Sequence, residues 1–211
     1  NDDDLEELID VVASSIGGLT NPTKLENTFQ TVKHSNISHT TIKAYLDILQ
    51  DVFLIERAVR YDIKGRKYID TPAKYYFSDL GLRNARLNFR QPEETHMMEN
   101  LIYNELRLRG MSVDVGVVVK NEKDANGVSV RKQLEVDFVC NLGSQRYYIQ
   151  SALRLPTVEK REQEVRSLKS INDSFRKFVI TEDLISRYQD NDGIVYISIY
   201  EFLLDENSLL V

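Results

Sequence analysis

The chain has a single cysteine in 211 residues, so no disulfide can form within it. Cys140 lies in the apolar run Phe138-Val139-Cys140, which predicts a small buried hydrophobe rather than a catalytic thiol. No apolar run approaches the about 20 residues that span a bilayer. The start, Asn1-Asp2-Asp3-Asp4, also lacks the basic and apolar regions of a secretory signal. We therefore expect a cytoplasmic protein.

Several sequence patterns that would identify an enzyme are missing. His34, His39 and His96 lack the spacing of a metal cluster, and no Ser-His-Asp set can be assembled. No GxxxxGK[ST] motif occurs, so the chain carries no P-loop for ATP. The net charge of −6 argues against a surface that is basic throughout, but leaves a local basic patch open.

The composition, 42% hydrophobic and 28% charged, is that of an ordinary globular protein. At this length the chain can form one large domain or two modest ones. The pattern of elements changes near residues 88–95, from helices with a short hairpin to a helix, three strands, a helix and a strand. We predict two domains, residues 1–90 and 91–211.

The first half predicts three short helices and a hairpin. Apolar residues recur at helical spacing from Leu5 to Ile16. A second helix begins after the Asn21-Pro22 cap and stops near 34–36. Ser38 caps a third, whose apolar face is predicted to run from Ile42 to Phe53. Three helices followed by a hairpin from Leu54 to Phe77 predict a winged helix-turn-helix domain.

Basic residues concentrate in the predicted wing. Between residues 57 and 74 the sequence holds six basic side chains against Asp62 and Asp70. Such a surface can neutralise nucleic-acid phosphates, and the alternative is a solvated hairpin packed against its neighbour. Lys43 on the outward face of the third helix joins the set. The candidate nucleic-acid-binding residues are Lys43, Arg57, Arg60, Lys64, Arg66 and Lys67.

The second half combines strands with acidic and amide groups. A helix from about Thr95 to Arg109 carries Glu99, and three strands, a helix and a further strand follow. Asp137 lies in one apolar strand and Gln150 ends the next, a spacing that a hairpin could bring together at one edge of a sheet. The tyrosine pairs Tyr75-Tyr76 and Tyr147-Tyr148 are each predicted to place one ring in a core.

This order of elements is that of the restriction-endonuclease fold, and the Asp137 region resembles nucleases of the PD-(D/E)xK type. More broadly, the chain resembles the C-terminal region of a bacterial and archaeal family of AAA-type ATPases. In that family a P-loop domain is followed by a winged helix and a nuclease-like domain of unknown activity. The matching stretches are TIKAYLDILQDVFLIERAVRYD, KYYFSDLGLRNA, MMENLIYNELRLRG, LEVDFVC, YYIQSALRL and EKREQEVRSL.

The resemblance implies an αβββαβ nuclease-like domain in an α+β or α/β chain, and an ATP-binding domain upstream of Asn1. It also implies a degenerate site of Glu99, Asp137 and Gln150, because the second acid is an amide and the lysine position is Ala152. Glu99 and Asp137 could still hold Mg²⁺ weakly.

Three functions stay open. The first is an accessory region that binds DNA, or a protein partner, under the control of its own ATPase domain. The second is an active metal-dependent nuclease. The third is a protein-binding scaffold within an ATPase oligomer.

Overall fold

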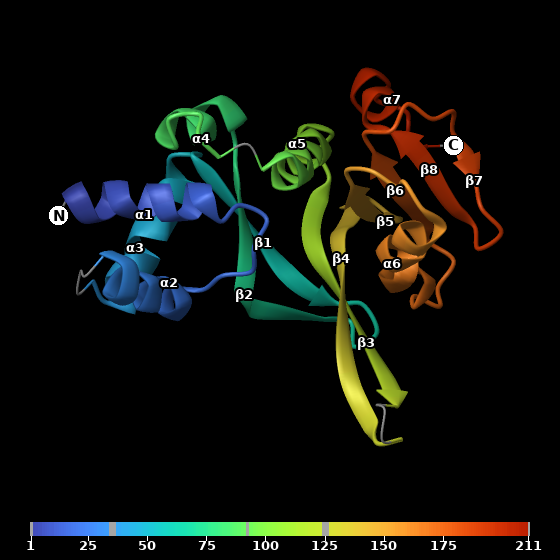
Figure 1. Cartoon of the computed structure of the whole chain (residues 1–211), viewed down its shortest axis with the longest axis horizontal. Helices are drawn as coiled ribbons and strands as arrows, with labels where there is room; N and C mark the ends of the chain where they lie inside the picture. Colours follow the sequence, from blue (N-terminus) through green and yellow to red (C-terminus); the bar gives the residue numbers. More distant parts are fainter. Residues whose placement is uncertain (1, 34–36, 92, 124–126, 211) are drawn as a thin grey trace. The chain divides into compact units, whose positions relative to one another are not determined.

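The computed structural model describes residues 2–33, 37–91, 93–123 and 127–210. Within them the chain forms seven α-helices, a short π-helix and eight strands, a mixed α+β fold (Figure 1). The strands form one mixed sheet in the order β2-β1-β3-β4-β5-β6-β8-β7. No helix in these ranges is long and apolar enough to cross a membrane.

Residue contacts divide the chain into two compact units. We call residues 1–59 and 70–104 the helical unit, and residues 60–69 and 105–211 the sheet unit. Strands β1 (Ile55–Asp62) and β2 (Lys67–Phe77) and helix α5 (Glu94–Leu108) each contribute residues to both. The tip of the predicted wing therefore belongs to the sheet unit. The domain boundary after residue 90 stays a prediction.

The helical unit packs α1 (Asp2–Ser14), α2 (Pro22–Thr28), the π-helix Phe29–Lys33 and α3 (His39–Asp51) around one apolar core. The predicted caps are confirmed, since Asn21 and Ser38 accept hydrogen bonds from the backbone N–H groups of Lys24 and Thr41. The predicted stop at 34–36 lies outside the described residues. The placement of Phe53 on the apolar face is wrong. It follows the end of α3 with φ of 58° and is 79% exposed.

A further helix, α4 (Leu80–Arg86), was not predicted, although Asp79 caps it. Its Arg83 is fully buried and donates to the carbonyl oxygens of Ala13 and Gln91. This arginine ties α4 to the end of α1.

The sheet unit contains β3 (Ser112–Lys123), β4 (Ser129–Leu142), β5 (Gln145–Ala152), β6 (Arg176–Thr181), β7 (Tyr188–Gln189) and β8 (Ile194–Ser198). Strands β3, β4 and β5 pair antiparallel, whereas β5, β6 and β8 run parallel. The far ends of β3 and β4 extend as a two-stranded ribbon beyond the other strands (Figure 1). Helix α6 (Val158–Lys169) packs on β4 and β5, and α7 (Ile199–Leu204) on β6 and β8.

All residues of β5 from Tyr147 to Ala152 are buried, because both faces of the sheet are covered there. The prediction that each tyrosine pair places a ring in a core is confirmed, but the implied outward-facing partner is wrong. Tyr147 and Tyr148 are both buried, as are Tyr75 and Tyr76. Cys140 is also buried as predicted, and burial, with a contribution from Asp114, raises its pKa above the ordinary thiol value.

Candidate functional site

The structure brings Asp137 and Gln150 together on neighbouring strands. The register of β4 and β5 pairs Phe138 with Ile149, which places the two residues opposite each other. The Gln150 side-chain amide donates to Asp137 Oδ2 over 2.7 Å, and the Ser151 backbone N–H donates to the same oxygen over 2.8 Å. Ser167 on α6 donates to Gln150 Oε1 over 3.3 Å. Both side chains are buried beneath α6.

This arrangement does not fit a divalent metal. Mg²⁺ needs several oxygen ligands facing one point, whereas the Gln150 side chain directs an N–H group at the carboxylate. The position of the nuclease lysine is Ala152, which is 3% exposed within the apolar core. Among the described residues, no group of three or more His, Cys, Asp and Glu side chains is placed to hold a metal ion. Asp137 is held by hydrogen bonds that stabilise the end of a strand pair.

Glu99 lies in the helical unit and has its own buried partners. Its Oε1 accepts from the Lys74 ammonium over 2.9 Å and from the Tyr76 hydroxyl over 2.6 Å. All three residues are buried. Lys74, one of the basic residues of the predicted wing, is therefore engaged in a buried ion pair rather than presented to a ligand.

The six candidate nucleic-acid-binding residues fall into two groups. Lys43 forms an exposed ion pair with Asp47 on α3, and the Arg57 guanidinium is held 2.8 Å from an Asp70 oxygen; all four residues lie in the helical unit. Arg60, Lys64, Arg66 and Lys67 lie in the sheet unit. Arg60 is half-buried in β1 beside Val115 of β3, while the other three are exposed at the hairpin tip.

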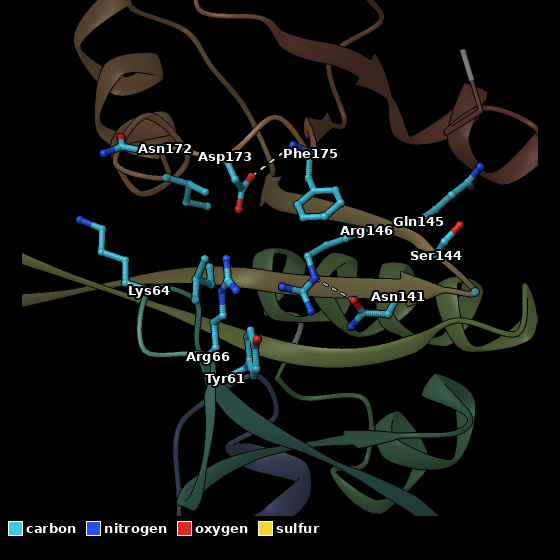
Figure 2. Close-up of a pocket in the computed structure, with 13 residues that line it drawn as sticks. Tyr61, Lys64, Arg66, Asn141, Ser144, Gln145, Arg146, Asn172, Asp173 and Phe175 are labelled. Carbon is cyan, nitrogen blue, oxygen red and sulfur yellow. Dashed lines mark hydrogen bonds between the residues drawn. The ribbon is translucent and has the colours of Figure 1, made fainter.

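The hairpin tip forms one wall of a cleft in the sheet unit, with a volume of about 740 Å³. Its other walls are the turn between β4 and β5 and the loop from α6 to β6. In Figure 2 Lys64 and Arg66 approach it from the tip, Arg146 lies across its middle, and Asp173 and Phe175 lie opposite. Within the described part of the chain, no carboxylate forms an ion pair with Lys64 or Arg66.

Arg146 is held in the cleft by both polar and aromatic contacts. Its Nε donates to Asn141 Oδ1 over 2.8 Å (Figure 2). Its guanidinium carbon lies 5.0 Å from the Tyr61 ring centre and 5.6 Å from that of Phe175, within the range of cation–π attraction. Asp173, the one carboxylate that lines the cleft, accepts from the Tyr148 hydroxyl over 2.6 Å. The cleft thus combines three cations with aromatic faces.

A second groove of about 370 Å³ adjoins the cleft and shares Lys64 and Asn172 with it. Its lining adds Lys120 from β3 with Arg166 and Lys169 from α6. Glu122 pairs with Lys120 over 3.3 Å and with Arg166, and Glu162 pairs with Lys169 over 2.7 Å. Together the cleft and the groove are lined by six cations and two carboxylates, in a chain whose net charge is −6.

Sequence reasoning did not identify Arg146, Phe175 or the groove residues. Arg146 lies two residues after Leu142-Gly143-Ser144, a sequence that favours a turn, and Phe175 follows the polar segment Asn172-Asp173-Ser174. Such segments carry binding residues more often than the elements that they connect. No sequence pattern, however, brings these two loops to the hairpin tip. That depends on the parallel pairing of β1 with β3.

Known proteins that resemble this chain leave its function undefined. Residues 1–93 match a domain of unknown function, DUF8612. An uncharacterised protein of Haemophilus influenzae is 32% identical over 200 residues, which make up 95% of this chain and 46% of that protein. The chain thus spans about half the length of this curated relative. The crystal structure of protein VC1899 from Vibrio cholerae aligns with a TM-score of 0.38 and 11% identity, over 94% of this chain and 53% of that one.

Proposed function

We propose that this chain is the nucleic-acid-binding accessory region of a larger AAA-type ATPase, and that the cleft of the sheet unit is its binding surface. The observation that carries the proposal is the convergence of Lys64 and Arg66 with Arg146 around one cleft. Cations without carboxylate partners attract phosphates, and association releases the counterions bound to the nucleic acid. The alternative of a neutral or buried hairpin is less favoured, since Lys64, Arg66 and Lys67 are exposed.

The surroundings of Asp137 support binding without cleavage. A nuclease of this type needs metal-bound water next to a cation, but here an amide and a backbone N–H occupy one carboxylate oxygen. The active-nuclease alternative is therefore less favoured. We propose that the nuclease-like fold is retained as a scaffold that holds the cleft loops.

The winged-helix assignment and the ATPase family are parts of the same proposal. Three helices followed by the β1–β2 hairpin support the first. The quoted stretches support the second, and a relative about twice as long leaves room for a further domain. Regulation by ATP and assembly into an oligomer would belong to that longer protein.

The test measures fluorescence anisotropy of labelled 20-nucleotide DNA and RNA, single-stranded and duplex, over a range of salt concentrations. We expect the double change Lys64→Glu with Arg66→Glu to weaken binding by roughly tenfold or more. We also expect the slope of log affinity against log salt to fall by roughly 1 to 2, because two phosphate contacts are lost.

The matched control is Lys24→Glu with Arg90→Glu, which makes the same change of net charge at exposed positions of the helical unit. This control should bind nearly as the unmodified chain does. Equal losses of affinity in both double variants would show that the effect comes from the change in net charge and not from the cleft. No binding by the unmodified chain to any of the four probes would refute the proposed function.

A further inference from the structure

We infer that the ligand of the cleft is a single-stranded nucleic acid, with one unpaired base stacked on Phe175 and its backbone running into the groove lined by Lys120 and Lys169. The inference rests on the proposed function and names the form of nucleic acid. The aromatic and amide lining of the cleft favours a single strand, because a site that binds only phosphates does not require such side chains.

Phe175 presents an aromatic ring to a cleft that also contains three cations. It is 41% exposed, although it lies between the buried core of β6 and the end of α6. Arg146 covers part of the ring and bridges it to Tyr61, which is 9% exposed. A double helix hides its base faces in the stack, whereas an unpaired base can stack on such a ring. The exposed ring therefore favours a single strand.

Amide side chains line the same cleft. Arg146 engages Asn141 Oδ1, and the Tyr147 hydroxyl donates to Gln145 Oε1, so the NH₂ group of each amide is its remaining polar group. Asn172 lies at the junction with the groove. Uncharged donors beside an aromatic face suit the edge of a base, whereas phosphates are better bound by the cations. The cleft thus separates a base-binding part from a phosphate-binding part.

The groove provides a path for the backbone beyond that base. Lys64 lines both the cleft and the groove. A nucleic-acid strand that leaves the cleft beside Lys64 therefore reaches Lys120, Arg166 and Lys169 next. Lys120 also lies directly opposite Lys132 in the β3–β4 ribbon, which adds a second positive charge next to it. Lys120 pairs with Glu122, and Lys169 pairs with both Glu162 and Asp192. These ion pairs are partly exposed, and exchanging such pairs for phosphates costs little.

The experiment compares the full chain with two variants on labelled dT20, U20 and a blunt 20-base-pair DNA duplex. We expect at least tenfold tighter binding of a single strand than of the duplex. Phe175→Ala should weaken single-strand binding roughly 5- to 100-fold, the range for loss of one stacked base, and change duplex binding less than twofold. Lys120→Glu with Lys169→Glu should weaken dT20 binding but leave a trinucleotide, dT3, within twofold.

A spectroscopic measurement separates stacking from a change in folding. The chain contains no tryptophan, so Phe175→Trp introduces a single indole at the proposed stacking position. Its emission should be quenched when dT3 or dT20 is added, and the variant should keep single-strand affinity within about threefold. Circular dichroism and the melting temperature of each variant report its folding.

The outcomes distinguish this inference from the proposed function. Loss of binding with Lys64→Glu and Arg66→Glu, but none with Phe175→Ala, would keep nucleic-acid binding and overturn the single-strand inference. So would equal affinity for duplex and single strand, or unquenched tryptophan at saturation. A preference for DNA over RNA, or the reverse, identifies the source of the strand and supports the inference. Absence of all binding would overturn both.

Discussion

Asn100 forms hydrogen bonds with backbone groups of β2 at the edge of the sheet. This strand lies at one end of the strand order, so its outer backbone groups lack a strand partner. The Asn100 side chain accepts from the Phe77 N–H over 2.9 Å and donates to the Phe77 carbonyl over 2.8 Å. It is fully buried. The Asn104 amide also donates to the Phe77 carbonyl over 3.0 Å, so two side chains of α5 replace the hydrogen bonds of a neighbouring strand.

We predict that Asn100→Ala lowers the free energy of unfolding by about 1 to 3 kcal/mol, because it leaves the buried Phe77 N–H without a partner, while the Phe77 carbonyl keeps its hydrogen bond from Asn104. Urea denaturation followed by circular dichroism measures the change. Leu108→Ala, on the same helix but 82% exposed, should change it by less than about 0.5 kcal/mol. Similar effects from both variants would contradict the role of Asn100.

Asp114 gives the sheet unit a predictable dependence on pH. Burial raises the pKa of its carboxyl above the ordinary value, although a hydrogen bond from Tyr68 and the charges of Arg146 and Arg107 oppose the shift. A carboxyl whose pKa is raised by folding stabilises the fold below its unfolded pKa of about 3.9. This contribution is lost as pH rises through the folded pKa.

We therefore predict that Asp114→Asn raises the melting temperature at pH 7, and that its advantage shrinks as pH falls toward 4. Differential scanning calorimetry of both proteins at closely spaced pH values between 4 and 8 measures the difference. An advantage that is constant with pH, or larger in acid, would show that ionisation of Asp114 is not its cause.

At the scale of elements, two glycines that follow helices allow the energetic cost of backbone strain to be distinguished from the cost of steric crowding. Gly17, after α1, and Gly110, after α5, have φ of 71° and 77°. A Cβ atom at Gly17 would lie 2.9 Å from His96 Nδ1 and 3.3 Å from the Glu99 carboxylate oxygens. A Cβ atom at Gly110 would meet nothing within 4 Å. Both glycines therefore have the left-handed backbone conformation, but only Gly17 has side chains close enough to crowd an added Cβ atom.

We predict that Gly110→Ala costs about 1 to 2 kcal/mol, the cost of a left-handed conformation. Gly17→Ala should cost at least about 1 kcal/mol more, because His96 and Glu99 must move. Chemical denaturation of the two single variants measures both costs. Equal destabilisation by the two variants would mean that His96 and Glu99 can move away from the new Cβ atom at Gly17 without an energetic cost.

The sequence predicted most elements because they have local signals. Polar caps at Asn21, Ser38 and Thr157 begin three helices, and apolar runs identify the main strands. Helices α4 and α7 are only seven and six residues long, too short for a clear periodicity. Phe53 shows the opposite error, since its apolar character fits the helical pattern but the chain leaves the helix before it.

At the scale of the whole molecule, we predict no phosphodiester cleavage by the purified chain with Mg²⁺ or Mn²⁺, since the Asp137 carboxylate is engaged by donors. Fluorescent single-stranded and duplex substrates measure it, with Asp137→Ala as the control for contaminating nuclease. Cleavage that this variant abolishes would contradict the prediction. The double change Gln150→Glu with Ala152→Lys should destabilise the chain by about 3 kcal/mol or more without restoring cleavage. It places two charges in a buried region.

We also predict that the chain by itself does not bind ATP, because no phosphate-binding glycine loop occurs in its sequence. Isothermal titration with ATP and Mg²⁺ tests this directly. Micromolar affinity would contradict it. Heat released only by a longer protein that includes an upstream domain would agree with the proposed ATPase region.

The sequence by itself determined the local structure: the caps, the apolar strands, the two facing residues Asp137 and Gln150, and the basic segment near the hairpin. These follow from periodicity and short-range hydrogen bonding, which depend on neighbours along the chain. Tertiary structure decided which basic residues are engaged and which are exposed. Lys74 and Arg57 form ion pairs with carboxylates. Lys64 and Arg66 instead line a cleft together with Arg146 and Phe175. That convergence joins segments about 80 to 110 residues apart, so no local pattern could encode it.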